Sequence, residues 1–374
     1  MIGHRIRQAR QAAGLTLAAL GARIGVAHTA IQKYEKGIIT PSSSILLKLA
    51  QACGVRTEYF FRLHTVELVN PEFRKLSTFG KTAQEELTIK VIDLVEKRVE
   101  LLGSFPDSPI PAFELPAGLP EHIENLEQIE AIADQVRNAW MLGMDPIPDV
   151  CDTFEACGLL VIVVNNNHPG FSGLKATART NDGRTYPIIV VSARWPGDRQ
   201  RFTLAHELAH LLISGRLAYH LDEEKACNRF AGAFLAPAVA VTRLLGQHRD
   251  ALEWKEIYTL KHEFGLSMAG WLMRAKQCEV ITESLYRSMT IRFSAKGWRK
   301  LEPEAPVPQE NPKLFEQLVY RALGEHCIPE SKAAELLGIP MMSFYKQRQL
   351  ETADDALVAQ NYGGTQHSNR KASP

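Results

Sequence analysis

The chain has 374 residues, of which 45% are hydrophobic and 23% charged, and its formal net charge is +1. This composition excludes an intrinsically disordered chain, and the length allows about two or three domains of ordinary size. The sequence has no apolar run of roughly eighteen residues, no apolar export signal near its start and no CxxC pair among its six cysteines, so we expect a cytoplasmic protein without membrane spans or structural disulfides.

The first 62 residues show apolar residues at helical spacing, interrupted by short turns. The pattern predicts a helix over residues 16–24 with Thr16 as its N-cap, a turn at Gly25–Ala27 and a second helix over residues 28–36. A further helix starts at Thr40-Pro41-Ser42. Two short helices joined by a tight turn that contains glycine are typical of a helix-turn-helix.

The same segment is basic. Nine Lys and Arg residues and two acidic residues give residues 1–62 a formal charge of +7, which leaves −6 for the rest of the chain. A basic helical domain on a slightly acidic body is typical of proteins that bind the phosphates of nucleic acids. The alternative is a small helical bundle with a basic, solvated face. The turn glycine, the charge and the helix spacing together favour DNA binding.

Residues 15–37 (LTLAALGARIGVAHTAIQKYEKG) and 40–55 (TPSSSILLKLAQACGV) resemble the lambda-repressor-like, XRE-type DNA-binding domain. The resemblance implies that the second helix of the pair enters the major groove of an operator and that the regulator is a homodimer. Gln32 suits adenine, and Lys33 suits guanine or a phosphate. Leu17 departs from the family, in which glutamine is common, so one phosphate contact is in doubt. The residues implied to contact DNA are His28, Thr29, Gln32 and Lys33.

Residues 66–120 are predicted to form a helical connector that ends in a linker. Residues 103–120 are rich in proline, which interrupts both helix and strand. Before them, a helix that starts at Thr82 carries a continuous apolar stripe opposite a charged face. The stripe favours packing on the body of the protein or on a second copy over a solvated spacer. Its members are Leu87, Val91, Leu94, Val95, Val99 and Leu102.

Residues 121–290 are predicted to form a domain with a small sheet. Apolar periodicity indicates its helices, and short apolar runs indicate buried strands. Two interpretations are open for one further group of residues, which form either the edge of a substrate cleft or ordinary turns. These are Thr177, Arg179 and Gly170–Gly173. The expected elements are helices over 121–138, 150–157 and 199–213, strands over 159–164 and 187–192, and turns over 165–173 and 180–185.

The helix over residues 199–213 contains His206, Glu207 and His210 in an HExxH arrangement. On a helix the two histidines share one face, one turn apart, and the glutamate lies beside the same site. Two imidazoles and an adjacent carboxylate at this spacing are typical of zinc peptidases. Apolar flanks indicate a buried helix, in which unpaired imidazoles and a carboxylate are costly. The alternative is a pair of core histidines with ordinary hydrogen-bond partners.

A zinc site of this type needs a third protein ligand and keeps one position for water. The helix expected over residues 221–237 offers Glu223 and Glu224. Glu224 comes three residues before Cys227 and therefore lies on the inner side of this helix, whereas Glu223 is less well placed. We assign Glu224 as the third ligand. The buried face is marked by Cys227, Phe230, Ala231, Phe234 and Leu235.

Residues 199–213 (RQRFTLAHELAHLLI), the following run EKACNRFAGAFLAP and residues 140–164 are similar to the ImmA/IrrE family of metallopeptidases. The resemblance implies a gluzincin-like site with His206, His210 and Glu224 as metal ligands and Glu207 as the general base. Zinc is the expected cofactor, with manganese or iron as alternatives for two imidazoles and a carboxylate. The candidates for stabilising an oxyanion are Tyr219, His220 and His248. The alternative for each of them is an ordinary surface residue.

Residues 310–355 are predicted to form a small helical module. Two short helices are separated by Gly338-Ile339-Pro340, and residues 331–338 resemble the first half of another helix-turn-helix. Contact with a protein, a lid over the site and contact with DNA are the alternative roles. Residues 356–374 are polar and are expected to be disordered.

The sequence thus predicts a mainly α protein with a small β-sheet (α+β), in which a helix-turn-helix domain over residues 1–65 is joined to a metallopeptidase domain. Known relatives of the peptidase cleave a repressor. The resemblance therefore implies a double-stranded DNA operator and a repressor- or antitoxin-type substrate, or cleavage of the chain itself. The alternative is a non-proteolytic XRE-type repressor or antitoxin whose peptidase-like domain is a sensor. The basic N-terminal domain disfavours a digestive peptidase.

Overall fold

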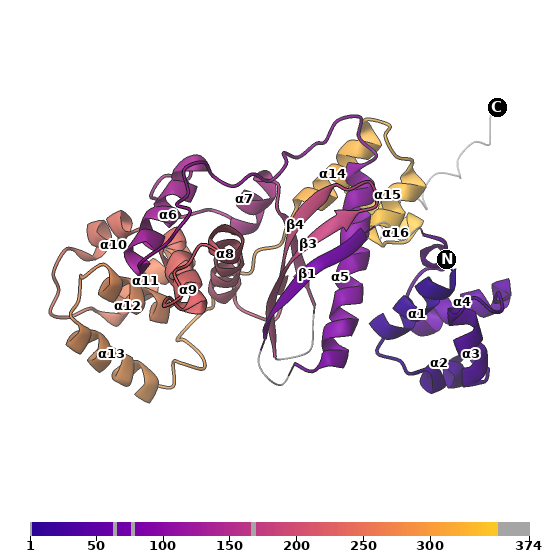
Figure 1. The fold of residues 1–374 in the computed structure, drawn as a ribbon, viewed down its shortest axis with the longest axis horizontal. Coiled ribbons are helices and arrows are strands. Elements are labelled where there is room, and N and C mark those ends of the chain that lie inside the picture. Colours follow the sequence, from indigo (N-terminus) through magenta and orange to yellow (C-terminus); the bar gives the residue numbers. More distant parts are fainter. Residues whose placement is uncertain (1, 63–65, 76–78, 166–169, 351–374) are drawn as a thin grey trace, which may run out of the picture. The chain divides into compact units, whose positions relative to one another are not determined.

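The computed structural model describes residues 2–62, 66–75, 79–165 and 170–350 (Figure 1). Over these residues the chain is mainly helical with one four-stranded sheet, which confirms the predicted α+β class. None of the described helices is both long and apolar enough to cross a membrane. The tail expected to be disordered, residues 356–374, lies outside the described residues.

The chain divides into two compact units. The first consists of the chain up to Glu96 together with Ile110–Lys313, and it contains the helix-turn-helix, the sheet and the HExxH helix. The second consists of Lys97–Pro109 and the chain from Leu314 onward.

The N-terminal domain is a bundle of short helices around an apolar core that includes Ile31. Thr16 caps the second helix, because its side-chain oxygen accepts a hydrogen bond from the backbone N–H of Ala19 (3.1 Å). Gly25 ends that helix in the left-handed conformation (φ 75°), which glycine adopts without strain. Both features agree with the predicted helix-turn-helix. The elements are α1 (Ile2–Ala12), α2 (Leu17–Ile24), α3 (His28–Glu35), α4 (Ser43–Cys53) and the 3-10 helix η1 (Thr57–Phe61).

The segment after this domain corrects the prediction that the connector is helical from residue 66, because Val66–Lys75 forms a strand, β1. Pro71 argues against a strand when only the sequence is considered, because proline lacks the N–H that a central strand must donate. β1 accepts Pro71 because it lies at the edge of the sheet, where its pairing is irregular between Val69 and Glu72.

Helix α5 (Lys81–Leu102) follows β1 and carries the predicted apolar stripe. Glu96 of α5 forms a buried ion pair with Arg5 of α1 (2.8 Å), and Asp93 pairs with Arg62 (3.0 Å). The stripe is buried, which favours packing within the chain over a solvated spacer. Its buried members include Leu87, Val91, Val95, Val99 and Leu102.

The sheet has the strand order β1–β3–β4–β2. β2 (Leu160–Val164) and β4 (Thr185–Ser192) correspond to the predicted apolar strands and pair in parallel. β3 (Phe171–Thr180) is antiparallel to both β1 and β4. β3 corrects the turn expected up to residue 173, of which residues 166–169 lie outside the described part of the chain. Its small residues have a weak strand preference, so the pairing on both sides stabilises the strand.

Helix α8 (Gly197–Ile213) carries the HExxH residues and lies between the sheet and helix α9 (Glu223–Leu235) (Figure 1). Leu208 of α8, Phe230 of α9 and Trp271 are fully buried in one shared apolar core. This packing holds α8 and α9 side by side. The surrounding helices are α6 (Leu126–Ala139), α7 (Val150–Ala156), α10 (Ala238–Leu245), α11 (Trp254–Phe264), α12 (Met268–Gln277) and α13 (Glu283–Ala295).

A segment after α13 ties α7 to the start of α8. The Glu310 carboxylate accepts hydrogen bonds from the backbone N–H groups of Val150 (2.8 Å) and Cys151 (3.1 Å), and it pairs with the buried guanidinium of Arg201. The side chain of Gln200 forms two hydrogen bonds of 2.9 Å with the backbone of Glu310. These contacts fix the first turn of α8 and hence the position of the HExxH residues.

The same contacts bear on the end of the domain. Helix α13 continues past residue 290, where the sequence places that end. Because Glu310 is part of the packing around α8, we propose that the domain extends to Lys313. The second unit then contains α14 (Leu314–Gly324), α15 (Glu330–Leu337) and α16 (Met341–Arg348).

Candidate metal centre

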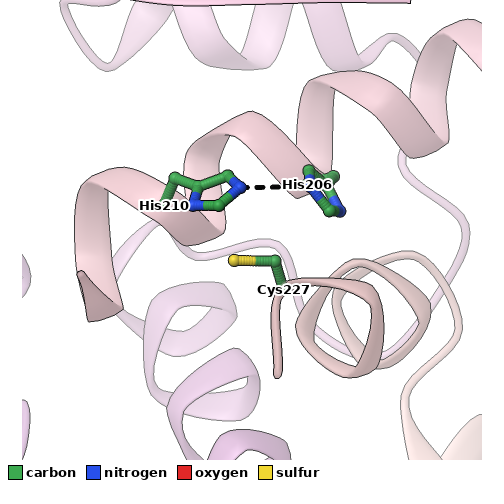
Figure 2. A group of neighbouring side chains, drawn as sticks. All are labelled: His206, His210 and Cys227. Atoms are coloured by element: carbon green, nitrogen blue, oxygen red, sulfur yellow. Dashed lines mark hydrogen bonds between the residues drawn. The ribbon is translucent and has the colours of Figure 1, made fainter. Parts of the chain in front are cut away.

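Two histidine side chains of α8 point their Nε2 atoms towards each other. His206 and His210 lie one helical turn apart, and their Nε2 atoms are 3.2 Å from each other (Figure 2). The side chain of His206 is fully buried, and that of His210 is 11% exposed. The i, i+4 spacing within α8 thus brings two nitrogen donors to a common space, which the exposed side chain of Glu224 borders.

The other nitrogen of each ring is occupied by a residue of α9. His206 Nδ1 donates a hydrogen bond to Asn228 Oδ1 (3.0 Å), and His210 Nδ1 donates to Glu223 Oε1 (2.9 Å). Ser214 Oγ donates to the same Glu223 oxygen (2.6 Å). With the proton on Nδ1, a neutral imidazole presents an unprotonated Nε2.

The two Nε2 atoms are 3.2 Å apart, close enough for one ring to donate a hydrogen bond to the other or for both to bind one cation. Burial, and then the charges of Arg74 and His210, lower the pKa of His206 to about 3, so its ring is neutral near pH 7. The hydrogen bonds to Asn228 and Glu223 are of the kind that orients metal-ligating histidines in proteins. The donor set therefore fits a metal ion.

Glu224 supplies a third donor. One of its carboxylate oxygens lies 3.4 Å from His206 Nε2, and the other lies 3.4 Å from His210 Nε2. Zinc bound tetrahedrally at about 2.1 Å from each ligand separates its ligand atoms by about 3.4 Å. The spacing of these donors therefore matches three corners of a zinc site. Glu223 faces the opposite nitrogen of His210, which favours Glu224 over Glu223 as the third ligand.

Cys227 lies beside the same two rings and is a donor that the sequence does not predict, because its apolar neighbours indicate only the buried face of the helix. Its Sγ atom, His206 and His210 offer ligand atoms within 4.8 Å of one another (Figure 2). Burial raises the pKa of the Cys227 thiol, which disfavours the thiolate that binds metals. Glu224 remains the proposed third ligand, with Cys227 as the alternative. Their three-residue spacing on one helix is the signal that links them.

Glu207 is buried beside the two histidines. Its side chain is 2% exposed, and its Oε1 atom has no hydrogen-bond partner among the described residues. Burial raises the pKa of Glu207 to about 7, against the opposing charges of Arg74 and Lys175. An unsatisfied carboxyl group in a buried site is costly. A carboxyl group with a pKa near neutrality suits a general base.

Strand β3 passes close to Glu207. A Cβ atom added to Gly173 would lie 3.2 Å from Glu207 Oε1 and 2.8 Å from Thr203 Cγ2, so a glycine is needed at this position. Lys175, two residues further along β3, is buried and pairs with Glu72 of β1 (3.1 Å). Glycine here allows β3 to approach the HExxH helix directly.

Arg74 of β1 lies directly opposite Gly173 of β3. Opposite residues share one face of a sheet, so Arg74 is directed towards α8, where its Cζ atom is 5.8 Å from the ring centre of Phe202. Burial lowers the pKa of Arg74, against the opposing charges of Glu207 and Glu224. Its Nη1 atom is buried without a hydrogen-bond partner among the described residues. Arg74 is not among the residues predicted from the sequence, because no strand is expected in this segment from its local pattern.

The three residues considered for stabilising an oxyanion are less well placed. The side chain of Tyr219 is fully exposed. His220 Nε2 lies 3.1 Å from the carbonyl oxygen of Glu124, in the loop before α6. Within the described part of the chain, no hydrogen bond joins Tyr219, His220 or His248 to His206 or His210.

The second helix of the helix-turn-helix, α3, presents the residues to which DNA contact is assigned. Ile31 of α3 is fully buried and fixes the inner face of the helix. The assigned residues lie on the outer face, and their contact with bases remains a prediction. All four are exposed: His28, Thr29, Gln32 and Lys33.

Two regions of the chain match known protein families. Residues 6–60 match the helix-turn-helix family, and residues 170–276 match the family of the IrrE N-terminal-like domain, an M78-type peptidase domain. The second match contains His206, Glu207, His210 and Glu224, and it excludes β1 with Arg74.

Three curated relatives are transcriptional regulators by name. The HTH-type transcriptional regulator y4wC of Sinorhizobium fredii is 31% identical over 106 residues, which is 28% of this chain and 70% of that protein. A transcriptional regulator in the ATPase CF(0) region of Rhodospirillum rubrum is 45% identical over 60 residues, and y4aM of S. fredii is 42% identical over 60 residues. Each of these two matches covers 16% of this chain, and 56% and 42% of the respective relative. No solved structure matches the chain.

Proposed function

Since the chain belongs to the helix-turn-helix transcriptional regulators and carries an IrrE N-terminal-like, M78-type peptidase domain, we propose that it is a regulator that binds an operator through α3 and hydrolyses a peptide bond at a zinc site on α8 and α9. One observation carries the enzymatic part of the proposal. The donor atoms of His206, His210 and Glu224 lie 3.2–3.4 Å from one another beside the buried Glu207.

In this proposal each polar residue of the site has one role. His206, His210 and Glu224 hold zinc, while Asn228 and Glu223 fix the orientation of the two rings. Bound zinc lowers the pKa of water and polarises a carbonyl group. Glu207 accepts the proton of the attacking water and passes it to the leaving amine, a role that suits its buried carboxyl group.

Arg74 is the proposed oxyanion stabiliser. Its Nη1, which has no hydrogen-bond partner in the part of the chain that the structure describes, donates a hydrogen bond to the carbonyl oxygen of the substrate as negative charge develops there. Three observations support this role: the register of Arg74 opposite Gly173, its approach to Phe202 of α8, and its electrostatic influence on Glu207.

We propose a repressor- or antitoxin-type protein as the substrate, with cleavage of the chain itself as the second route, and a homodimer as the operator-bound form. The helix-turn-helix domain supports a substrate that acts on the same DNA. The connector strand β1 supports a coupling of the two domains, because it follows the DNA-binding domain and supplies Arg74 to the peptidase site.

The test compares the full-length wild type with Glu207→Gln and His210→Ala. Each protein is analysed for bound zinc by mass spectrometry and incubated with zinc and a peptide library prepared from a bacterial proteome. We expect about one zinc per chain in the wild type and in Glu207→Gln, loss of zinc in His210→Ala, and new peptide termini only with the wild type. Zinc binding without cleavage of the library, of the chain itself or of a co-expressed neighbouring regulator would favour the non-proteolytic sensor.

A further inference from the structure

The last three described helices repeat the architecture of the first three. α15 and α2 each have eight residues, and so do α16 and α3. A glycine in the left-handed conformation ends the first helix of each pair: Gly25 has φ 75° and ψ 34°, and Gly338 has φ 71° and ψ 21°. The N-caps of the second helices also agree, with φ −64° and ψ 146° at Ala27 and φ −61° and ψ 148° at Pro340.

The hydrogen bonds of the two turns correspond as well. The N–H of Val26 donates to the carbonyl of Gly21 (2.9 Å), and the N–H of Ile339 donates to the carbonyl of Ala334 (3.1 Å). Each bond spans five residues across the helix end, which is the Schellman arrangement. The second turn is therefore a helix-turn-helix turn in conformation, hydrogen bonding and length.

The agreement extends to the preceding helix and to the core. Residues of α1–α3 and α14–α16 align without a gap when Leu17 is placed on Glu330 (both sets are labelled in Figure 1). At five aligned core positions both residues are at most 9% exposed. The aligned pairs are Ile6 with Val319, Ala9 with Ala322, Leu15 with Ile328, Leu20 with Ala333, and Ile31 with Phe344. The two runs differ at two further core positions, because Ile24 is buried and its counterpart Leu337 is partly exposed, and Leu336 is buried and its counterpart Arg23 is exposed.

The outer face of α16 has the chemistry of a helix that contacts DNA. The alignment places Met342 on Thr29, Tyr345 on Gln32 and Lys346 on Lys33, and all three residues of α16 are exposed. α16 carries no acidic residue and two cations, of which Lys346 is exposed and Arg348 pairs with Glu330 of α15. A helix with this charge is attracted to phosphates, and an exposed methionine is suited to an apolar contact such as that with a thymine methyl group.

We propose that α14–α16 form a second helix-turn-helix and that α16 contacts duplex DNA, so that one chain carries two DNA-binding elements. The matched backbone, the matched core and the charge of α16 carry this proposal, which does not depend on the metal site. A docking site for a protein is the competing use of the same face.

The test measures DNA binding by the full-length chain with a duplex that the wild type selects from a random pool. Affinity is measured over a series of salt concentrations, and the bound duplex is mapped by hydroxyl-radical footprinting. Lys346→Ala is compared with Lys300→Ala, which removes an exposed cation outside both trihelical runs. Both variants are also made in a Lys33→Ala background, in which the contacts of α3 are weakened.

We expect Lys346→Ala to lower the slope of log K against log salt by about one and to remove one segment of the footprint. Lys300→Ala should change neither. In the Lys33→Ala background, the residual binding should depend on Lys346. If Lys346→Ala and Lys300→Ala have the same slope and footprint as the wild type in both backgrounds, α16 does not contact DNA, and the proposal is overturned in favour of a protein partner.

Discussion

Arg74 of β1 and Gly173 of β3 lie directly opposite each other in the sheet, and a side chain at Gly173 would collide with the HExxH helix next to Glu207. A strand of the connector therefore places a cation on the side of the sheet that faces Glu207, the proposed general base. β1 lies outside the residues that match the peptidase family. The site is thus assembled from the peptidase domain and from the chain segment that joins it to the DNA-binding domain.

If Arg74 stabilises the oxyanion, Arg74→Met should lower kcat and kcat/KM for peptide cleavage together, by about 10²-fold. Zinc content should stay at the wild-type level, because Arg74 is not a ligand. Arg179→Met is the matched control, since Arg179 belongs to β3 and pairs across the same two strands with Glu67 of β1, but its side chain is half-exposed. Steady-state kinetics on one cleaved peptide checks this. If Arg74→Met retains full activity, a residue other than Arg74 stabilises the oxyanion.

Gly173→Ala should destabilise the first unit by about 1–3 kcal/mol, because the added Cβ would approach Thr203 Cγ2 to 2.8 Å and force β3 away from α8. Urea unfolding followed by circular dichroism measures the change. Gly324→Ala is the control, since nothing lies within 4 Å of its added Cβ and its backbone is not left-handed. If the Gly173→Ala protein is as stable as the wild type, β3 and α8 must be farther apart than the contacts of the added Cβ imply.

The two glutamates at the start of α9 should differ in their effect on zinc. If Glu224 is the third ligand, Glu224→Ala should weaken zinc binding more than 100-fold, whereas Glu223→Gln should disturb only the orientation of His210 and weaken binding about 10- to 100-fold. Cys227→Ser should leave the affinity near that of the wild type. Competition with a chromophoric chelator gives the three Kd values. Loss of zinc in Cys227→Ser, with retention in Glu224→Ala, would make Cys227 the third ligand.

Gln32→Ala should relax the base preference at one operator position, because Gln32 lies on the exposed face of α3 and its amide can pair with adenine. The cost is about 1–3 kcal/mol for the preferred base and less for other bases. Selection from a random duplex pool, repeated with the wild type and the variant, reads this directly. An unchanged selected motif would show that Gln32 does not read a base.

Acid sensitivity should depend on Glu130 of α6. Burial alone would raise its pKa, but hydrogen bonds and charges of Arg274 of α12 and Arg229 of α9 outweigh burial and lower the pKa of Glu130 below 4.5. The nearby Asp134 has a raised pKa, mainly through burial and also through the charge of Glu130. Because the folded pKa of Glu130 is depressed, its stabilisation is complete above the unfolded pKa and is lost as the pH falls through the folded pKa.

Glu130→Ala should therefore cost about 3 kcal/mol near neutral pH, since it leaves the buried Arg274 unpaired, and it should flatten the loss of stability below about pH 4.5. Urea unfolding at a series of pH values measures both effects. Glu283 provides the control. Lys276 and Arg287 also lower its pKa, but its side chain is exposed, so Glu283→Ala should change the acid limb much less than Glu130→Ala. An unchanged acid limb in Glu130→Ala would assign the acid sensitivity to other carboxylates.

Local patterns were enough to predict the helix-turn-helix and the HExxH helix. The cap at Thr16, the left-handed Gly25 and the buried Ile31 are consequences of residues close together in the chain. The i, i+4 spacing of His206 and His210 likewise implies a shared face of one helix. In contrast, β1 and β3 were not predicted, because Pro71 and the small residues of β3 have little intrinsic strand preference.

The sequence by itself determined which residue types are available for a metal site and on which helices they lie, because helical spacing is a local property. Only the tertiary structure decided which neighbours complete that site. The packing of α9 on α8 directs Glu224 and Glu223 to different nitrogens of His210, and the pairing of β1 with β3 brings Arg74 towards α8. Arg74 and His210 are far apart in the chain, and no local pattern specifies a contact that depends on strand register and helix packing.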